Sequence, residues 1–292
     1  MKTASGILIV NSFLKSNQTD EIYSWLLEAG HRANIDLTLK TNGDYIADIA
    51  SNAIIPNIPE CDFVLFWNKD VFLGRALEEH GLRLFNSSEA IRLCDNKALT
   101  HEALKGVVKM PKTFKIPMTF KGIYYTNFDF LPILEDNLGY PFVIKECFGS
   151  YGGQVYLAHN RTEAVEILKK TDAVDCIAQE YIEKSKGRDL RVYIVGGQVV
   201  AAMERNNPND FRANIANGGL SLPYQITDEQ AEMAIVATKA LGLDFGGVDL
   251  MFMDNDEPIL CEVNSNAQFK GLFDATGINI ADHIIEHIVS TI

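Results

Sequence analysis

The chain has 292 residues, of which 47% are hydrophobic and 22% charged, and its formal net charge is −13. This composition excludes a wholly disordered, fibrous or coiled-coil protein, and the length predicts two or three compact units. The negative charge disfavours a nucleic-acid partner, because phosphate backbones are also anionic, although a local group of cations can still bind a small anion.

The sequence also bears on the cellular compartment. Its apolar runs, such as residues 7–10 and 63–67, are far shorter than a membrane span, and its start lacks the apolar core of a signal peptide. The five cysteines are scattered and never form a CxxC pair, which favours reduced thiols over disulfides or zinc ligands. We therefore expect a cytoplasmic protein with no membrane partner.

In the first third of the chain, short apolar runs alternate with amphipathic stretches. This alternation predicts strands and crossover helices of a parallel sheet. A helical pattern then covers residues 86–104, with Ser87 or Ser88 as the N-cap, and Pro111 ends it. From Pro141 onward, glycines separate β-rich segments, and helical stretches are expected at residues 162–171 and 228–241. These blocks predict α+β lobes beside the parallel sheet.

Two apolar runs around a polar turn make residues 246–264 a strong hairpin signal. A turn centred on Asn255 and Asp256 places Asp249 directly opposite Glu262, and Asn264 follows on the same face. Facing carboxylates destabilise a hairpin, whereas a hard divalent cation between them turns the repulsion into binding. Magnesium is the natural candidate. The alternative is an ordinary ribbon whose carboxylates point to solvent or pair with lysines.

A second constellation lies at residues 140–154, where a predicted strand carries Lys145 and a glycine-rich loop with Ser150, Gly152 and Gly153 follows. Glycines let backbone amides approach phosphate oxygens, and the lysine supplies positive charge. The order differs from a GxxxxGK[ST] loop, because the lysine precedes the glycines. A plain glycine-rich hairpin turn is the alternative.

Residues 187–205 predict another hairpin, which turns at Gly196 and Gly197 and places Asp189 opposite Glu204. Charges on one face of such a strand are usually the solvated side of a half-buried sheet.

At the C-terminus, residues 283–287 match an HxxEH zinc motif, but no further ligand segment follows, and the isoleucines predict an amphipathic closing helix.

Taken in this order, the segments resemble the ATP-grasp superfamily, and most closely its RimK-like branch of glutamate and amino-acid ligases. The resemblance covers nearly the whole chain after residue 85. The matching stretches are residues 94–97, 142–154, 179–182, 187–204, 210–214, 218–219, 247–249 and 262–264. It implies a mixed α/β and α+β fold. A parallel-sheet pre-ATP-grasp domain (1–95) would precede the small lobe (96–182) and the large lobe with the metal site (183–292).

The resemblance also implies roles for individual residues. ATP phosphates would be bound by Lys97, Lys145, Ser150, Gly152 and Gly153. The adenine would lie at the hinge formed by Gln179, Glu180, Tyr181 and Ile182, with Asp189 near the ribose. The catalytic residues that approach the triphosphate or acyl phosphate would be Arg212 and Asn214. Mg²⁺, with Mn²⁺ as the other candidate, would be carried by Asp249, Glu262 and Asn264.

The activity that the resemblance implies is phosphorylation of a carboxylate by ATP, followed by attack of an amine on the acyl phosphate. Both substrates would be small molecules or peptides, and a homo-oligomer is possible.

The chain departs from the ribosomal-protein-modifying members, which typically have Ala-Ser-Pro-Gly where residues 265–271 read SNAQFKG, and its first 85 residues match them poorly. Ribosomal-protein glutamylation is therefore not assigned. Ligation of the D-alanine or glutathione type stays open, as does a non-catalytic nucleotide-binding protein. Retention of both lysines and all three metal ligands argues against the last.

Overall fold

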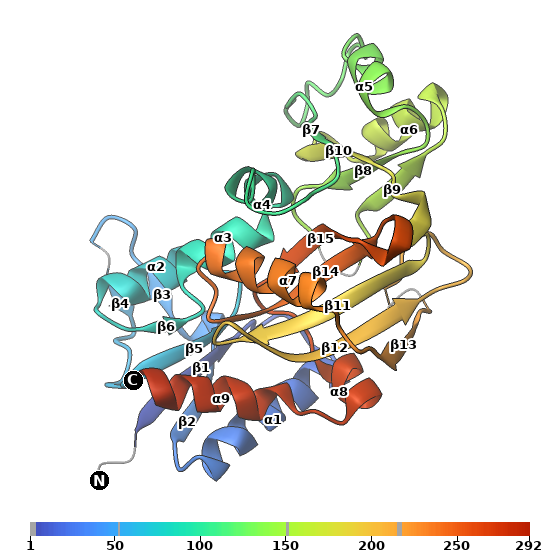
Figure 1. The fold of residues 1–292 in the computed structure, drawn as a ribbon. Helices are drawn as coiled ribbons and strands as arrows, with labels where there is room; N and C mark the ends of the chain where they lie inside the picture. The colour runs from blue at the N-terminus through green and yellow to red at the C-terminus, as the bar shows by residue number, and fades with distance from the viewer. Residues whose placement is uncertain (1–3, 52, 150–151, 215–217) are drawn as a thin grey trace.

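The computed structural model describes residues 4–51, 53–149, 152–214 and 218–292, and its N-terminal part is built on a parallel sheet (Figure 1). The strands stand in the order β2-β1-β5-β6, and their bounds are β1 Ser5–Val10, β2 Asp36–Thr41, β5 Phe63–Trp67 and β6 Leu84–Phe85. The crossover helices are α1 (Asn17–Arg32) and α2 (Val71–Glu79). A short ribbon, β3 (Ile46–Ala47) and β4 (Ile54–Ile55), lies at the periphery. The predicted parallel sheet is confirmed.

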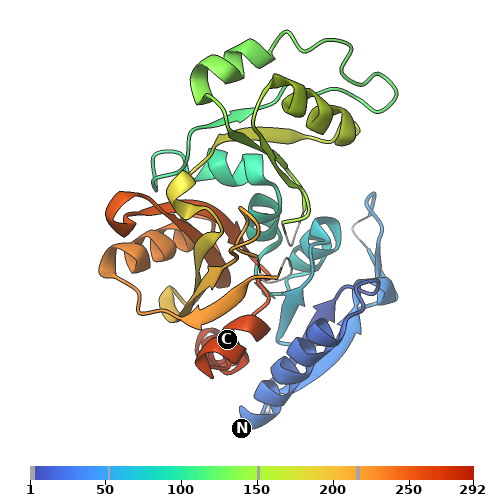
Figure 2. The same cartoon turned by 90° about the vertical axis from the view of Figure 1, so that its right-hand side faces the viewer.

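An antiparallel sheet with two helices on one face stands apart from the N-terminal sheet (Figures 1 and 2). Its strands follow the order β7-β10-β8-β9, with β7 Thr113–Lys115, β8 Phe142–Glu146, β9 Val155–Ala158 and β10 Cys176–Glu180. The helices are α5 (Leu131–Leu138) and α6 (Arg161–Lys170), and their apolar sides share one core with β8 and β10. Strand β8 therefore delivers Lys145 to the opposite, uncovered face of this sheet.

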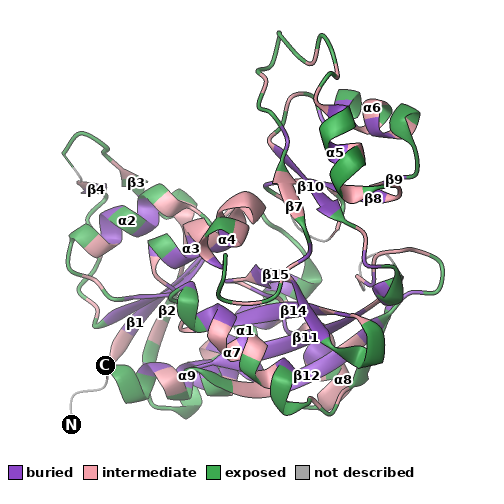
Figure 3. Ribbon diagram, turned by 45° about the horizontal axis from the view of Figure 1, so that its top comes forward, coloured by how far each residue is buried: buried purple, intermediate pink, exposed green. Residues whose placement is uncertain are grey.

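A larger antiparallel sheet, in the order β13-β12-β11-β14-β15, forms the centre of the molecule. Its strands are β11 Arg188–Val195, β12 Gln198–Asn206, β13 Leu220–Pro223, β14 Phe245–Phe252 and β15 Pro258–Asn264. Helix α7 (Asp228–Ala240) packs on one face, and α8 (Lys270–Thr276) and α9 (Ile280–Thr291) cover the other. Helix α9 also lies against α1, so one core joins this sheet to the N-terminal sheet. Figure 3 shows the buried strands between these helices.

The helical stretch before the small lobe is interrupted, contrary to the single pattern expected at residues 86–104. Helix α3 (Ser88–Asp95), capped by Ser87, ends where Asn96 adopts an extended conformation. The Asn96 side chain then accepts hydrogen bonds from Ala98 N and Leu99 N, which makes it the N-cap of α4 (Lys97–Ala103). The break places Lys97 in the first turn of the new helix.

The hairpin of β11 and β12 does turn at Gly196 and Gly197, but its predicted register is wrong at the far end. Between Tyr193 and Ile194 the pairing shifts by one residue, so Asp189 lies opposite Arg205 instead of Glu204. A β-bulge of this kind adds a residue to one strand and changes which side chains face each other. The bulge therefore pairs Asp189 with a cation.

The last helix, α9, and the apolar character of the helices as a whole can be compared with the sequence expectations. The isoleucines of α9, Ile284, Ile285 and Ile288, are buried, which confirms the amphipathic closing helix. A helix that combines the length and the apolar character needed to cross a bilayer is absent from the described ranges.

Gly187 connects the start of β11 to the segment that carries Arg212. Its N–H donates to Phe211 O at 2.8 Å, its carbonyl accepts from Asn207 N at 2.7 Å, and its φ is +65°. A Cβ at this position would lie 2.2 Å from Asn207 O. Gly197 has a similar φ of +75° but no atom within 4 Å of an added Cβ. A substitution at Gly197 therefore introduces backbone strain alone, whereas one at Gly187 introduces both strain and a steric collision.

We expect Gly187→Ala to destabilise the protein by about 3 kcal/mol or more, because both strain and collision arise. Gly197→Ala should cost about 1 kcal/mol, from the positive φ alone. Urea unfolding of both variants measures the difference, and equal losses would show that the Gly187 contact does not constrain this junction.

Candidate active site

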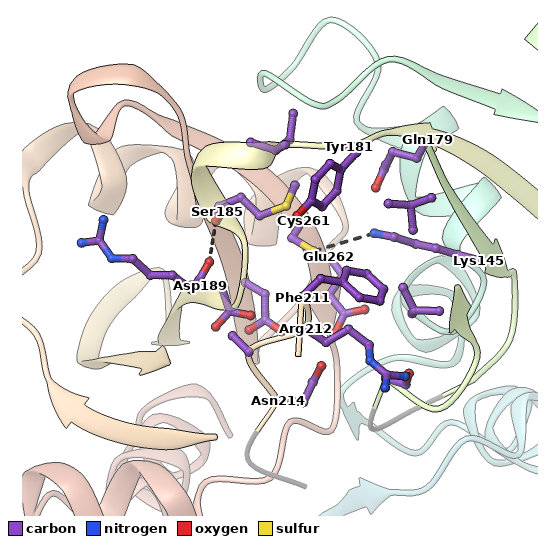
Figure 4. A pocket seen from close by; sticks show the side chains of 18 of the residues that line it. Lys145, Gln179, Tyr181, Ser185, Asp189, Phe211, Arg212, Asn214, Cys261 and Glu262 are labelled. Atoms are coloured by element: carbon purple, nitrogen blue, oxygen red, sulfur yellow. Dashed lines mark hydrogen bonds between the residues drawn. The ribbon is translucent and has the colours of Figure 1, made fainter. Parts of the chain in front are cut away.

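A cavity between the two antiparallel sheets gathers most of the predicted site residues (Figure 4). Its volume is about 100 Å³. The predicted residues that line it are Lys97, Lys145, Gly152, Gln179, Glu180, Tyr181, Ile182, Asp189, Arg212, Asn214, Asp249 and Glu262. Asn264 lines an adjoining cavity, Gly153 is exposed and does not line either one, and Ser150 lies outside the described residues.

The hinge end of the cavity is organised around Gln179 of β10, which is almost fully buried. Its Nε2 lies 3.1 Å from His101 Nε2 and donates to Thr113 Oγ1 at 2.9 Å. Burial, together with the nearby charge of Lys145, lowers the pKa of His101 to about 4, so the ring is neutral at pH 7. The sequence around His101 carries no signal for this contact, because the histidine stands alone and its partner Gln179 is far away in the chain.

Two lysines converge on the middle of the cavity. Lys145 of β8 is buried and points toward Cys261, with 3.8 Å between Nζ and Sγ, and Figure 4 shows Glu262 beside them. Lys97 Nζ lies 3.4 Å from Gly149 O, and its backbone N–H donates to Cys147 O at 2.9 Å. Within the described part of the chain neither lysine forms an ion pair. Such cations favour an anionic ligand.

The glycine-rich loop after β8 is tied to the opposite lobe by Arg212. The Arg212 Nη1 donates to Gly152 O at 2.6 Å, and its other nitrogens bind Asp210 at 2.7 and 3.0 Å. Gly149 packs against Gln154, whose Oε1 would be 2.6 Å from an added Cβ. This oxygen is buried and has no hydrogen-bond partner among the described residues. The loop and the Arg212 segment thus close the same side of the cavity.

The predicted pairing of the 246–264 hairpin is confirmed where it matters for a metal. Asp249 lies opposite Glu262, and Gly247 lies opposite Asn264. A bulge at Cys261 shifts the register toward the turn, since Leu250 already pairs with Leu260. Asn264 Nδ2 donates to Glu262 Oε1 at 3.1 Å. Asp249 and Glu262 thus line this cavity, and the Asn264 amide joins Glu262 from the adjoining one.

The alternative interpretation of this hairpin had Asp249 pointing to solvent or pairing with a lysine. The structure shows instead that Asp249 is bound by two arginines. Its carboxylate accepts bonds from Arg191 Nε and Nη2 and from Arg205 Nη2, the latter two at 2.7 and 2.9 Å. Burial alone would raise the pKa of Asp249, but the two arginines outweigh it and hold that pKa well below its usual range. The group is therefore ionised. Its Oδ2 already accepts bonds from both arginines, whereas its Oδ1 accepts one and keeps a lone pair for a further ligand.

Asp189 lines the cavity, but its carboxylate is bound by Arg205. Arg205 donates from Nε and Nη2 to the two Asp189 oxygens at 2.6 and 2.7 Å. Both Asp189 oxygens are engaged in this ion pair. The expected contact of Asp189 with a ribose stays a prediction. Arg205 was missed as a site residue, because the expected register paired Asp189 with Glu204.

A second cavity of about 860 Å³ adjoins the first one and opens between the N-terminal sheet and the large lobe. Arg205, Asn214 and Glu262 line both cavities. Its remaining wall comes mainly from residues 11–23 and 67–69 on one side and from residues 264–274 on the other. The metal-ligand candidates therefore stand at the junction of the two spaces.

Comparison with known proteins identifies the family. The model of the RimK-like ATP-grasp domain matches residues 95–288. The chain belongs to the RimK-like ATP-grasp family. A probable alpha-L-glutamate ligase of Enterobacter sp. is 38% identical over 240 residues, which are 80% of this chain and 78% of that protein. Human N-acetylaspartylglutamate synthase A is 33% identical over 229 residues, which are 76% of this chain and 56% of that protein.

The fold has solved counterparts as well. The structure of D-alanine–D-alanine ligase from Bacillus anthracis complexed with ATP superposes with a TM-score of 0.74 at 16% identity, and the match covers 100% of this chain and 97% of that one. Family membership confirms the expected fold and the expected class of activity, an ATP-dependent carboxylate–amine ligase. The roles of the individual residues remain predictions.

The HxxEH motif of α9 has another role in the structure. His283 is exposed, and His287 lies 3.6 Å from Asp244 while its ring packs edge-on against Phe85. No group of three His, Cys, Asp or Glu side chains suited to a metal occurs in the described ranges. The histidines belong to the packing of the closing helix.

We expect Asp249→Asn to destabilise the protein by about 3 kcal/mol, because it leaves two buried guanidinium groups without their shared charge. Glu262→Gln should cost less than about 1 kcal/mol, since the Glu262 carboxylate has no ion-pair partner among the described residues. Urea unfolding without nucleotide or metal measures both. Similar losses would argue against a structural role for the arginine pairs.

Proposed function

We propose that the two joined cavities catalyse ligation through an acyl phosphate, with the nucleotide in the smaller cavity and the amine in the larger one. The observation that carries the proposal is the pair of lysines, Lys97 and Lys145, which face a buried space without a carboxylate partner among the described residues. A triphosphate supplies the missing negative charge. The protein as a whole has a charge of −13, so this local concentration of cations is selective for anions at this position.

The donor groups at the junction fit a hard divalent cation. Asp249, Glu262 and Asn264 offer carboxylate and amide oxygens, which are the ligands that Mg²⁺ prefers, and Mn²⁺ suits the same set. Glu262 and Asn264 are already joined by a hydrogen bond, and Asp249 is held by its arginines. When bound, the metal would neutralise charge on the phosphates during transfer.

The residues of the chain divide the chemistry between them. Lys145 and Lys97 hold the phosphates and stabilise the charge that spreads over the γ-phosphoryl group as it transfers to a carboxylate oxygen. The resulting acyl phosphate contains a good leaving group. A neutral amine then attacks the acyl carbon, the C–N bond forms, and inorganic phosphate leaves with the oxygen that came from the carboxylate. Arg212 and Asn214 line this region and would steady the acyl phosphate.

The loop that Arg212 binds gives the site a means to exclude water. Because Arg212 Nη1 holds Gly152 O, the glycine-rich loop is attached to the large lobe over the cavity. An acyl phosphate hydrolyses if water reaches it, so a closed loop protects the intermediate. The hinge residues Gln179 to Ile182 would bind the adenine on the other side.

The names of the relatives guide the choice of substrate. One relative is a probable alpha-L-glutamate ligase and another an N-acetylaspartylglutamate synthase. We therefore propose L-glutamate as the first amine substrate to test. The carboxylate donor is to be found by screening amino acids and small carboxylates in pairs with L-glutamate.

The direct test is incubation of the protein with Mg²⁺, ATP and these pairs, with measurement of ADP, phosphate and a product lighter than the two substrates by one water. Glu262→Ala should lower the rate by about 100-fold or more and leave the fold intact. Glu257→Ala is the matched control, because Glu257 lies on the same hairpin but pairs with Lys109 at the surface. Formation of AMP and pyrophosphate, or unchanged ADP release by Glu262→Ala, would contradict the proposal.

Lys145→Met keeps the aliphatic stem and removes the charge, so we expect weaker nucleotide affinity and a lower rate, each by at least about 10-fold. Lys109→Met removes a surface lysine and should change neither. Titration of ATP and steady-state kinetics measure the two effects. If Lys145→Met kept both affinity and rate, the glycine loop would be a structural turn only.

A further inference from the structure

The larger cavity contains four cationic side chains, which differ in how far their charge is neutralised. Lys69 pairs with Asp95, and Lys270 pairs with Asp274 at 3.1 Å and with Glu21 at 3.3 Å. Arg205 binds two carboxylates, whereas Arg191 binds a single one among the described residues, namely Asp249, which it shares with Arg205. Arg191 is therefore the least neutralised of the four.

Arg191 is also fixed in place and aimed by its contacts. Its Nε and Nη2 bind Asp249, and the side chain is 11% exposed. Its stem lies over Gly247, where an added Cβ would be 3.1 Å from Arg191 Cδ. The third nitrogen, Nη1, has no hydrogen-bond partner in the described part of the chain. A guanidinium group with two anchored nitrogens can present the third to a ligand without a further loss of side-chain freedom.

The position of Arg191 distinguishes the two substrates of the reaction. Arg191 lines the larger cavity and is absent from the lining of the smaller one, where the lysines are. The donor carboxylate has to meet the γ-phosphate near those lysines. A ligand group on Arg191 therefore belongs to the other substrate, the amine.

Two amide side chains from facing walls of the larger cavity provide an independent sign of a polar ligand. Asn266 Nδ2 donates to Asn68 O at 2.8 Å, and Asn68 Oδ1 accepts from Lys69 N and Asp70 N. The remaining polar atoms of the two amides, Asn68 Nδ2 and Asn266 Oδ1, are buried and have no hydrogen-bond partner among the residues that the structure describes, and Asn68 is 3% exposed. Both residues line the larger cavity. Buried donors and acceptors of this kind call for a complementary ligand.

Charge favours an anion at Arg191 once the site is loaded. In the protein alone, Asp189, Asp249 and Glu262 offer three negative charges against the two of Arg191 and Arg205. Asp249 and Glu262 would hold a divalent cation, and the Asp249 charge would then be shared between that cation and the arginines. Arg191 then gains attraction for another carboxylate.

We propose that Arg191 is a specificity-determining residue that binds a carboxylate of the amine substrate, one that is not consumed in the reaction. The inference rests on the proposed function, because it assigns the amine to the larger cavity. It restricts the amine substrate to amino acids and peptides with a free carboxylate and excludes simple alkylamines.

The test is a double-mutant-type cycle. It removes the positive charge of Arg191 from the protein, or one carboxylate charge from the amine substrate, or both. Wild type, Arg191→Met and Arg191→Lys are compared with L-glutamate and with its two monoamides, L-glutamine and L-isoglutamine. We expect wild type to lose at least about 10-fold in kcat/KM when one of the two carboxylates becomes an amide. Arg191→Met should raise the KM for L-glutamate by a similar factor, leave the KM for ATP within about threefold, and no longer discriminate against that monoamide. Arg191→Lys should restore part of the preference.

The matched control is Arg161→Met, which removes an exposed arginine that binds Glu135 with two nitrogens far from the cavity. It should keep the wild-type preference. A fall in kcat for Arg191→Met with unchanged KM and unchanged discrimination would overturn the inference, since Arg191 would then only position Asp249.

Binding without turnover separates this inference from the proposed function. Trp67 lines the larger cavity, so its fluorescence reports binding of L-glutamate and the monoamides to protein saturated with Mg²⁺ and a non-hydrolysable ATP analogue. An Arg191-dependent preference for L-glutamate in this titration supports the inference even if no ligation is found. Equal binding of L-glutamate by wild type and Arg191→Met overturns it, even if ligation is found.

Discussion

The buried array of Asp189, Arg205, Asp249 and Arg191 is the interaction on which the site depends. Its members come from three neighbouring strands, β11, β12 and β14, so the array forms only when all three pair in the observed register. Removing one partner of a buried ion pair typically costs about 3–5 kcal/mol, because the other charge stays buried. The array therefore links correct strand pairing to the placement of Asp249, which lies opposite Glu262 of the neighbouring strand β15.

This constraint also explains how an acidic protein can bind a triphosphate. The cations of the array are balanced by aspartates, whereas Lys97 and Lys145 on the other side of the cavity have no such balance within the described residues. Under the proposed function, the anion would be directed to the lysines, and the candidate metal ligand Glu262 lines both cavities. Each cavity has its own charge pattern, which suits a reaction that brings a nucleotide and an amine to one carboxylate.

The sequence was sufficient for features that depend on local pattern. The alternation of apolar runs predicted the parallel sheet. Counting from the polar turn near Asn255 predicted Asp249 opposite Glu262, and the structure has this pair, although the bulge at Cys261 shifts the pairs nearer the turn by one residue. The features that it did not reveal depend on long-range pairing. A bulge in β11 and β12, invisible to residue counting from the turn, brings Arg205 to Asp189. The contact of Arg191 with Asp249 arises because β11 pairs with β14, and His101 reaches Gln179 only because Asn96 starts a new helix.

The central claim is that ATP phosphorylates the carboxylate before the amine attacks, and oxygen transfer tests it most directly. A donor carboxylate labelled with ¹⁸O is incubated with the protein, Mg²⁺, ATP and the amine, and the phosphate released is analysed by mass spectrometry. The account predicts one ¹⁸O atom in each phosphate formed with product, because the oxygen that attacked the γ-phosphoryl group leaves with it. Unlabelled phosphate, or label found in AMP, would contradict the account.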